Sequence, residues 1–173
     1  MMPNAAFAQR WSVSTNAVDW LNLGTLNAEG GVAMSQHISL AAGLRFNPWT
    51  YRKGDAAKQF ENRKQCYYAG LRYWPWHVYS GWWTSLRLQY QEYNRGGLFN
   101  PQAEEGDAYG IGISLGYTLM IHKSFNLEFG VGAWAGAAWY TAYSCPFCGS
   151  IVSSGTKAFL WPDNVMVSFV YIL

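Results

Sequence analysis

Five charged residues of this sequence lie at alternate positions of segments that otherwise consist of apolar and small residues. They are Glu29, Arg45, Arg72, Arg87 and Glu128. Successive side chains of an extended strand point to opposite faces, so each charge would face away from the apolar row of its segment. An isolated buried charge costs several kcal/mol, so charges that are enclosed together must pair. We therefore expect Glu29 and Glu128 to bridge the arginines inside a barrel. The alternative is that the same residues line a narrow conduit.

The three cysteines could support a second kind of chemistry. Cys145-Pro-Phe-Cys148 places two thiols in one loop, and Cys66 lies far away in the sequence. Structural zinc sites use four ligands, so this set is a weak metal signal. A disulfide between Cys145 and Cys148 is the preferred interpretation in an oxidising compartment, and free thiols are the alternative. We expect no metal and no other cofactor.

The elements that would position these residues are segments of strict alternation. The clearest is residues 125–140, where Phe125, Leu127 and Phe129 share one face and Asn126 and Glu128 the other. This run is longer than the roughly 5–6 residues of an ordinary strand and exceeds the ~9–11 that a tilted strand needs to cross a bilayer. The expected strands are residues 11–18, 25–34, 38–46, 64–74, 81–93, 108–120, 125–140 and 164–173. They predict an all-β fold, an eight-stranded antiparallel up-and-down transmembrane β-barrel of OmpA- or OmpX-like size.

The composition favours an outer face that meets lipid. Aromatic residues make up 18% of the chain and charged residues 13%, the latter about half of ordinary usage. The mean hydropathy of -0.10 gives no indication of helical membrane spans. The alternative, a soluble barrel with its faces reversed, would carry Lys, Glu and Thr where this sequence has mostly Gly, Ser, Asn and Ala. A net charge of +2 gives no reason to expect nucleic acid as a partner.

The connections between the expected strands alternate in length. Residues 35–37, 75–80 and 121–124 form short turns, whereas residues 47–63, 94–107 and 141–157 form longer polar loops. Bacterial outer-membrane barrels have short periplasmic turns and long outer loops, so we expect an integral outer-membrane protein with periplasmic N- and C-termini. Outer-membrane lipid and lipopolysaccharide would then be its partners. The basic loop 47–63 either meets lipid A phosphates or is simply solvated.

Aromatic side chains gather near both ends of the expected strands. We interpret them as girdles at the two membrane interfaces, and a sugar-binding platform is the alternative. The periplasmic group is Trp11, Trp74, Trp76, Tyr79, Trp82 and Phe125, and the outer group is Trp49, Tyr51, Tyr90, Tyr93, Tyr109, Trp139 and Trp161.

The positions of the three histidines bear on enzymatic activity. His37, His77 and His122 all fall in the expected periplasmic turns. A small barrel that hydrolyses or acylates lipid A would need a histidine beside a serine nucleophile or an acid near the outer leaflet. The sequence therefore favours a protein that is not an enzyme and has no catalytic residues.

The first residues resemble the end of a secretion signal. Ala6 and Ala8 occupy positions −3 and −1 relative to a cut before Gln9, which is the small-residue pattern of a signal-peptidase site. We expect residues 1–8 to be a signal-peptide remnant, or else a disordered tail. Residues 9–173 would then form the barrel.

Short motifs in a fixed order resemble one protein family. They are Thr15-Asn16, Asn47-Pro48-Trp49, LRYWPW (71–76), YNRGG (93–97), EG (105–106), LGY (115–117), NLEFGVG (126–132) and CPFCG (145–149). Together they resemble a domain-of-unknown-function family of small Gram-negative outer-membrane β-barrels that are often encoded beside fimbrillin-like genes. The resemblance implies location and architecture and supplies no catalytic residues.

The function that we expect follows from the barrel and from this resemblance. It is a non-catalytic outer-membrane barrel that acts as an envelope anchor, a scaffold or a surface-loop interaction protein, accessory to fimbriae, with an envelope or fimbrial protein as its partner. The alternatives are a narrow channel for ions or small solutes and a lipid-modifying outer-membrane enzyme.

Overall fold

The structure is a computed structural model that describes residues 10–51, 60–96, 102–144, 149–163 and 165–173. Ala6, Ala8, Cys145 and Cys148 lie outside the described residues, so the expected signal remnant and disulfide stay predictions.

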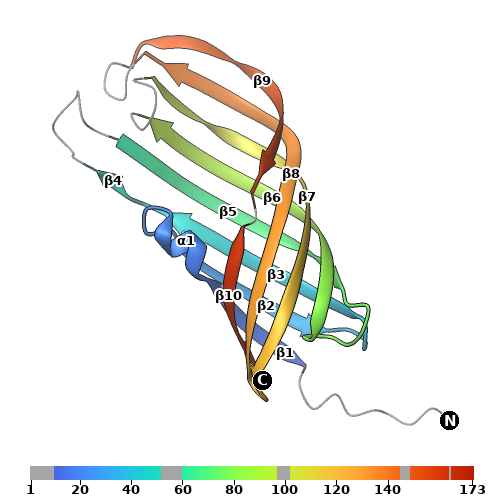
Figure 1. The fold of residues 1–173 in the computed structure, drawn as a ribbon. Helices are drawn as coiled ribbons and strands as arrows, with labels where there is room; N and C mark the ends of the chain where they lie inside the picture. The colour runs from blue at the N-terminus through green and yellow to red at the C-terminus, as the bar shows by residue number, and fades with distance from the viewer. Residues whose placement is uncertain (1–9, 52–59, 97–101, 145–148, 164) are drawn as a thin grey trace.

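Within the described residues, one helix and ten strands follow each other along the chain (Figure 1). They are β1 Trp11–Asn16, α1 Ala17–Leu21, β2 Leu26–Ala33, β3 Ile38–Asn47, β4 Thr50–Tyr51, β5 Phe60–Tyr73, β6 Gly81–Gly96, β7 Ala103–His122, β8 Phe125–Tyr143, β9 Ile151–Pro162 and β10 Met166–Ile172. Among the described residues, no helix is long and apolar enough to cross a membrane.

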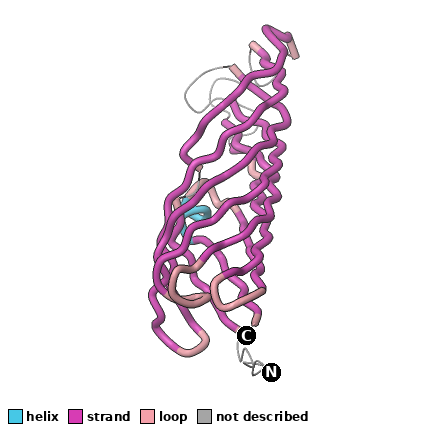
Figure 2. Tube along the Cα trace, turned by 90° about the vertical axis from the view of Figure 1, so that its right-hand side faces the viewer, coloured by secondary structure: helices cyan, strands magenta, loops and turns pink. Residues whose placement is uncertain are grey.

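The strands form a closed antiparallel barrel in which consecutive strands are neighbours. The barrel closes where Ser12–Asn16 of β1 pairs with β10. The eighth strand of the barrel is split in two, because β10 pairs with the first residues of β8 and β9 pairs with the rest of that strand. The short β4 only adds to the edge of β5. The predicted eight-stranded up-and-down barrel is therefore confirmed (Figures 1 and 2).

The wall departs from the predicted strands mainly in its upper part, away from the chain ends. The first strand was predicted to reach Val18 but ends at Asn16, whose side chain accepts a hydrogen bond from the Val18 backbone N–H and caps α1. The residues of β9 fall largely in a predicted loop, and β6 and β7 extend beyond their predicted ends. Both faces of these extensions carry polar residues, so the alternation that marks a half-buried strand is weak there.

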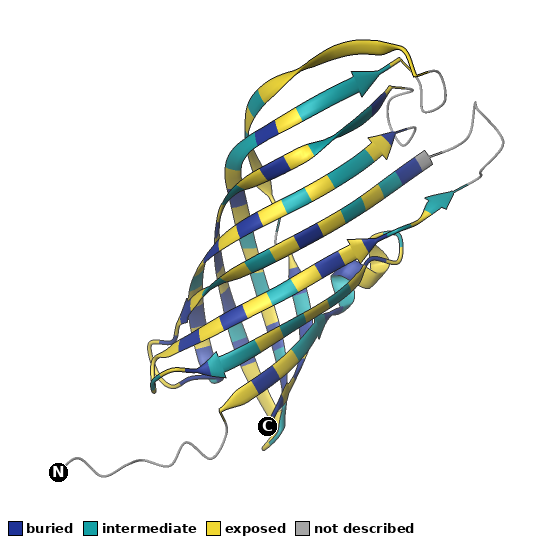
Figure 3. Cartoon of the chain, turned by 180° about the vertical axis from the view of Figure 1, so that it is seen from behind, coloured by how far each residue is buried: buried dark blue, intermediate teal, exposed yellow. Residues whose placement is uncertain are grey.

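Exposed and buried residues alternate along most of the wall (Figure 3). In β3 the apolar Leu40, Leu44 and Phe46 are exposed, while Ser39 and Arg45 are buried in the lumen. The barrel thus has an apolar outside and a polar, glycine-rich inside.

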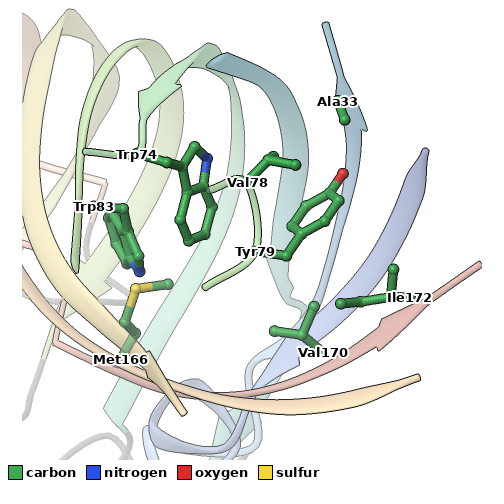
Figure 4. Close-up of a cluster of buried hydrophobic side chains, with 8 residues drawn as sticks. All are labelled: Ala33, Trp74, Val78, Tyr79, Trp83, Met166, Val170 and Ile172. Carbon is green, nitrogen blue, oxygen red and sulfur yellow. The ribbon is translucent and has the colours of Figure 1, made fainter. Parts of the chain in front are cut away.

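An apolar cluster fills the lumen at the end where the N- and C-terminal strands begin and finish (Figure 4). It contains Trp74 and Tyr79, which were predicted to lie in an outward aromatic girdle. That prediction is wrong for both, because Trp74 has the same parity as the inward Arg72 and Tyr79 turns inward in the following connection. The Trp74 indole N–H donates to Ser39 Oγ at 2.9 Å, and its ring packs edge-on against Tyr79.

Asn16 ties together three elements at the point where the wall changes course. Its amide N–H groups donate to Asp19 Oδ2 and to the Val165 carbonyl at 3.1 and 3.3 Å, and its Oδ1 accepts from the Val167 N–H at 3.0 Å. One buried side chain therefore links β1, α1 and the start of β10.

We expect Asn16→Ala to lower the free energy of unfolding by about 1–3 kcal/mol, because it removes a helix cap and leaves buried backbone groups without partners. Thermal unfolding of the purified protein, followed by tryptophan fluorescence, measures this change. Asn94→Ala is the matched control, since Asn94 lies on the outer face of β6. An equal loss in both variants would contradict the role given to Asn16.

Candidate functional site: a charged layer in the lumen

A layer of charged side chains crosses the middle of the lumen, directly above the apolar cluster. Arg72 of β5 binds Glu29 of β2 at 2.5 Å and Glu128 of β8 at 3.0 Å. The Thr118 hydroxyl also donates to Glu128 Oε1 at 3.1 Å. The Glu128 side chain is 1% exposed, so one arginine joins two carboxylates from different sides of the barrel in a site that water barely reaches.

The other two predicted arginines meet an acid that the sequence interpretation left out. Arg45 Nη1 and Arg87 Nη2 lie 3.3 and 2.8 Å from Asp163 Oδ2, and Gln89 Nε2 donates to the same oxygen at 3.2 Å. Arg45 Nε lies 3.2 Å from Asp19 Oδ2. All five predicted lumen residues thus lie inside the barrel. Glu29 and Glu128 were expected to bridge all three arginines, but in the structure they bind only Arg72.

Asp19 and Asp163 reach the lumen because the wall is interrupted on two adjacent strands. Asp19 lies in α1, where β1 has just ended, and Asp163 lies in the break between β9 and β10. The two breaks are adjacent, because the Asn16 side chain contacts residues on both sides. A residue in a break is released from strict alternation, so its carboxylate can turn into the lumen and reach an arginine of another strand.

Aromatic rings fill the space between the guanidinium groups. Tyr68 lies between Arg45 and Arg87, with its ring centroid 5.5 and 5.4 Å from their Cζ atoms. Arg72 lies 4.5 Å from the ring of Trp83, which belongs to the apolar cluster below. A guanidinium over a ring face gains electrostatic attraction that grows as water is excluded. The charged layer and the apolar cluster are therefore one continuous packing unit.

Glycines make room for these large side chains. A Cβ on Gly112 would lie 2.6 Å from Nε of Arg87, and a Cβ on Gly43 would lie 2.6 Å from Cζ of Tyr68. Real Cβ atoms do not approach other atoms so closely, so both positions require glycine as long as the arginine and tyrosine keep their places. This requirement explains the glycine at these two inward positions, whereas at Gly110 and Gly136 a Cβ would meet a backbone oxygen of the neighbouring strand.

The layer leaves little room for passage. A cavity of about 20 Å³ lies beside Arg72 and Arg87, enough for about one water molecule. The described side chains at this level therefore form a plug rather than a visible pore.

Cys66 and the three histidines lie outside the charged layer. Cys66 is buried and is a free thiol. His37 and His77 lie in the turns near the chain ends, with ring nitrogens 3.0 and 3.1 Å from the carbonyl oxygens of Trp74 and Val78. His122 ends β7 on the same side of the barrel.

The two halves of the plug should respond differently to the loss of an arginine. Arg72→Met would leave both Glu29 and Glu128 without their cation, and we expect it to lower the free energy of unfolding by about 3–5 kcal/mol. Arg87→Met should cost less, because Asp163 keeps Arg45 and Gln89. Denaturant unfolding followed by tryptophan fluorescence compares the two, with Arg63→Met on the outer face as the control. Equal losses for Arg72→Met and Arg87→Met would refute this division.

Comparisons with known proteins give a family. No curated protein and no solved structure matches the chain. A family model described as "Protein of unknown function (DUF3575)" matches residues 1–173, which confirms the resemblance to a domain-of-unknown-function family. The chain belongs to the DUF3575 family.

Proposed function

We propose that this chain is an integral, non-catalytic barrel of the bacterial outer membrane that anchors or scaffolds an envelope or surface partner through the part of its wall beyond the membrane. One observation carries the proposal. The outer face changes from apolar to polar along a row of tyrosines that are paired across three strands.

This boundary follows the strand pairing. Tyr67 of β5 pairs with Tyr90 of β6, and Tyr90 pairs with Tyr109 of β7. Two positions further from the chain ends, the outward residues are Gln65, Glu92 and Asp107, which are paired with one another in the same way. The Tyr90 hydroxyl donates to Asp107 Oδ1 at 2.7 Å, so this ring has its apolar part toward one zone and its hydroxyl toward the other. Such an orientation is typical of aromatic residues at a membrane interface.

The apolar zone has the height that a bilayer requires. On β7, outward apolar side chains occupy every second position from Tyr109 to Leu119, which is close to the ~9–11 residues of a membrane-spanning strand. The strand itself has 20 residues, so a good part of it would extend beyond the hydrocarbon. We infer that the extensions of β5 to β9 form a collar outside the membrane.

The proposed orientation rests on the connections. The turns β2–β3, β5–β6 and β7–β8 lie at the same end as the start of β1 and the end of β10 (Figure 1). Outer-membrane barrels keep short turns in the periplasm, so this end would be periplasmic and the collar would face the cell exterior.

The lumen supports an anchor over the alternatives. An apolar cluster and a charged layer fill the lower and middle parts of the barrel, which argues against a channel. The three histidines lie at the proposed periplasmic end, far from the outer leaflet where a lipid-modifying enzyme of the kind considered above would act. Planar bilayers that contain the wild-type protein should therefore show no ion conductance. Any conductance should appear only after Arg72→Ala removes a side chain of the charged layer.

A charge on the outer face distinguishes a membrane barrel from a soluble one. Ile113 is 61% exposed in the middle of the apolar zone. We expect Ile113→Arg to destabilise the barrel in lipid vesicles by about 2–4 kcal/mol, because the arginine would face hydrocarbon. The fraction of protein that migrates as a compact band before boiling measures folding. Gln65→Arg, beyond the tyrosine row, should fold like the wild type, and equal folding of both variants would exclude the proposed placement.

The collar can be tested as the interaction surface in cells. A photo-crosslinking residue at Asn94, on the outer face of the collar, should give a defined adduct with an envelope protein. The same residue at Leu115, in the apolar zone, should not. Adducts with equal yield and identity at both positions, or none at Asn94, would contradict the scaffold function.

A further inference from the structure

The lumen opens into a pocket of about 230 Å³ above the charged layer, which we call the outer chamber. Its lining includes Asp163 of the charged layer, basic and amide side chains, and a group of aromatic rings. The ring centroids of Trp134 and Phe159 are 4.5 Å apart in an edge-on contact, and Tyr93 packs against the same cluster. The outer chamber therefore combines aromatic surface with polar and charged groups, as small-molecule sites commonly do.

One side of the outer chamber is not closed by strand pairing. Among the described residues β9 has a single neighbour, β8, while β1 ends at Asn16 and gives way to α1. Residues of β9 and Asn22, which follows α1, both line the chamber. The side chains just outside this opening are apolar, since Leu160 is 73% and Leu21 86% exposed. An alkyl chain that leaves through the opening could contact these two leucines.

Two donors in the outer chamber have no acceptor. Lys64 is partly buried, and its ammonium group makes no hydrogen bond or ion pair with a described residue. The indole N–H of Trp134, a residue that is 5% exposed, also has no partner. The acid that lines the chamber, Asp163, is already held by Arg45 and Arg87. Buried donors are nearly always satisfied in folded proteins, so the Trp134 N–H, which lines the chamber together with Lys64, calls for an acceptor from outside the chain.

The charges around the chamber favour an anion. Lys64, Arg95 and Lys157 line it, against the single acid Asp163. Glu104 binds Lys157 at 2.7 Å and Arg95 at 3.2 Å at the rim, which holds these cations in place. Of the three cations that line the chamber, Lys64 is therefore the one whose ammonium group has no acid partner among the described residues.

We propose that the outer chamber binds the acidic head group of a single-chain amphiphile, whose alkyl chain leaves through the opening between β9 and α1. Lys64 and the Trp134 N–H bind the head, and Phe159 contacts the first part of the chain. The volume is below the roughly 300–1,000 Å³ of ordinary ligand sites, so the rest of the chain must lie outside. A free anion would satisfy the donors but would leave the aromatic rings and the opening unused. The proposal rests on the proposed function, because the emerging chain lies in the membrane.

Native mass spectrometry of the folded barrel in a non-ionic detergent tests the site, with dodecyl phosphate, laurate, dodecanol and inorganic phosphate as probes. We expect one dodecyl phosphate or one laurate per barrel, with at least tenfold weaker binding of dodecanol and of inorganic phosphate. Lys64→Gln and Trp134→Phe should each weaken dodecyl phosphate binding about tenfold, because each removes a donor to a charged group. The phenylalanine keeps the ring and removes only the N–H.

Matched variants separate the site from general effects. Lys123→Gln lies in the turn between β7 and β8, and Trp139→Phe lies on the outer face of β8, so both should bind like the wild type. Dodecanol or inorganic phosphate binding as tightly as dodecyl phosphate would overturn the proposal, as would unchanged binding by both Lys64→Gln and Trp134→Phe. Heat-dependent migration of every variant shows whether it is folded. A barrel that inserts into vesicles but does not bind the probes refutes the chamber alone, whereas failure to insert refutes the membrane placement.

Discussion

The irregular part of this barrel depends on one requirement, namely that an arginine buried in its lumen must meet an acid. The penalty for an unpaired buried charge is several kcal/mol, a large share of the stability of a domain of this size. Arg72 meets that requirement with acids from regular strands, Glu29 and Glu128. Arg45 has its acids in the two places where the wall is broken, in α1 and between β9 and β10. The two breaks in the wall thus supply the acids that neutralise Arg45.

The same breaks shape the space above the charged layer. Below them, β1 and β10 pair and the barrel is closed. Above them, β1 has become α1 and β9 continues with β8 as its described neighbour. The outer chamber lies between β9 and the segment that follows α1. Asp163 both lines the chamber and pairs with Arg45 and Arg87. Any change that loosens Asp163 would therefore disturb the plug and the chamber together.

The regular part of the wall could be predicted from the sequence because one face of each strand is apolar. The runs through Leu71 of β5 and Phe129 of β8 alternate regularly, so their outward apolar residues place the neighbouring Arg72 and Glu128 in the lumen. Asp19 and Asp163 could not be placed in this way, since residues in a break follow no alternation. A signal was nevertheless present, because three arginines against Glu29 and Glu128 leave a positive charge that a closed lumen does not tolerate. Ile151–Pro162 lacked the alternating pattern because both of its faces are largely exposed.

The two ends of the lumen are filled differently. Trp74, Trp83 and their neighbours seal the end near the chain termini with apolar packing, and Arg72 joins this cluster to the charged layer through its contact with Trp83. At the other end, Trp134 and Phe159 form a second aromatic cluster that is only partly closed. In the lower cluster the Trp74 indole N–H has Ser39 as its acceptor, whereas the indole N–H groups of Trp83 in the same cluster and of Trp134 in the upper one have no partner. Trp83 is enclosed by the apolar cluster and by Arg72, whereas Trp134 lines the outer chamber, so of these two indole N–H groups only that of Trp134 lies beside a pocket that a ligand could enter.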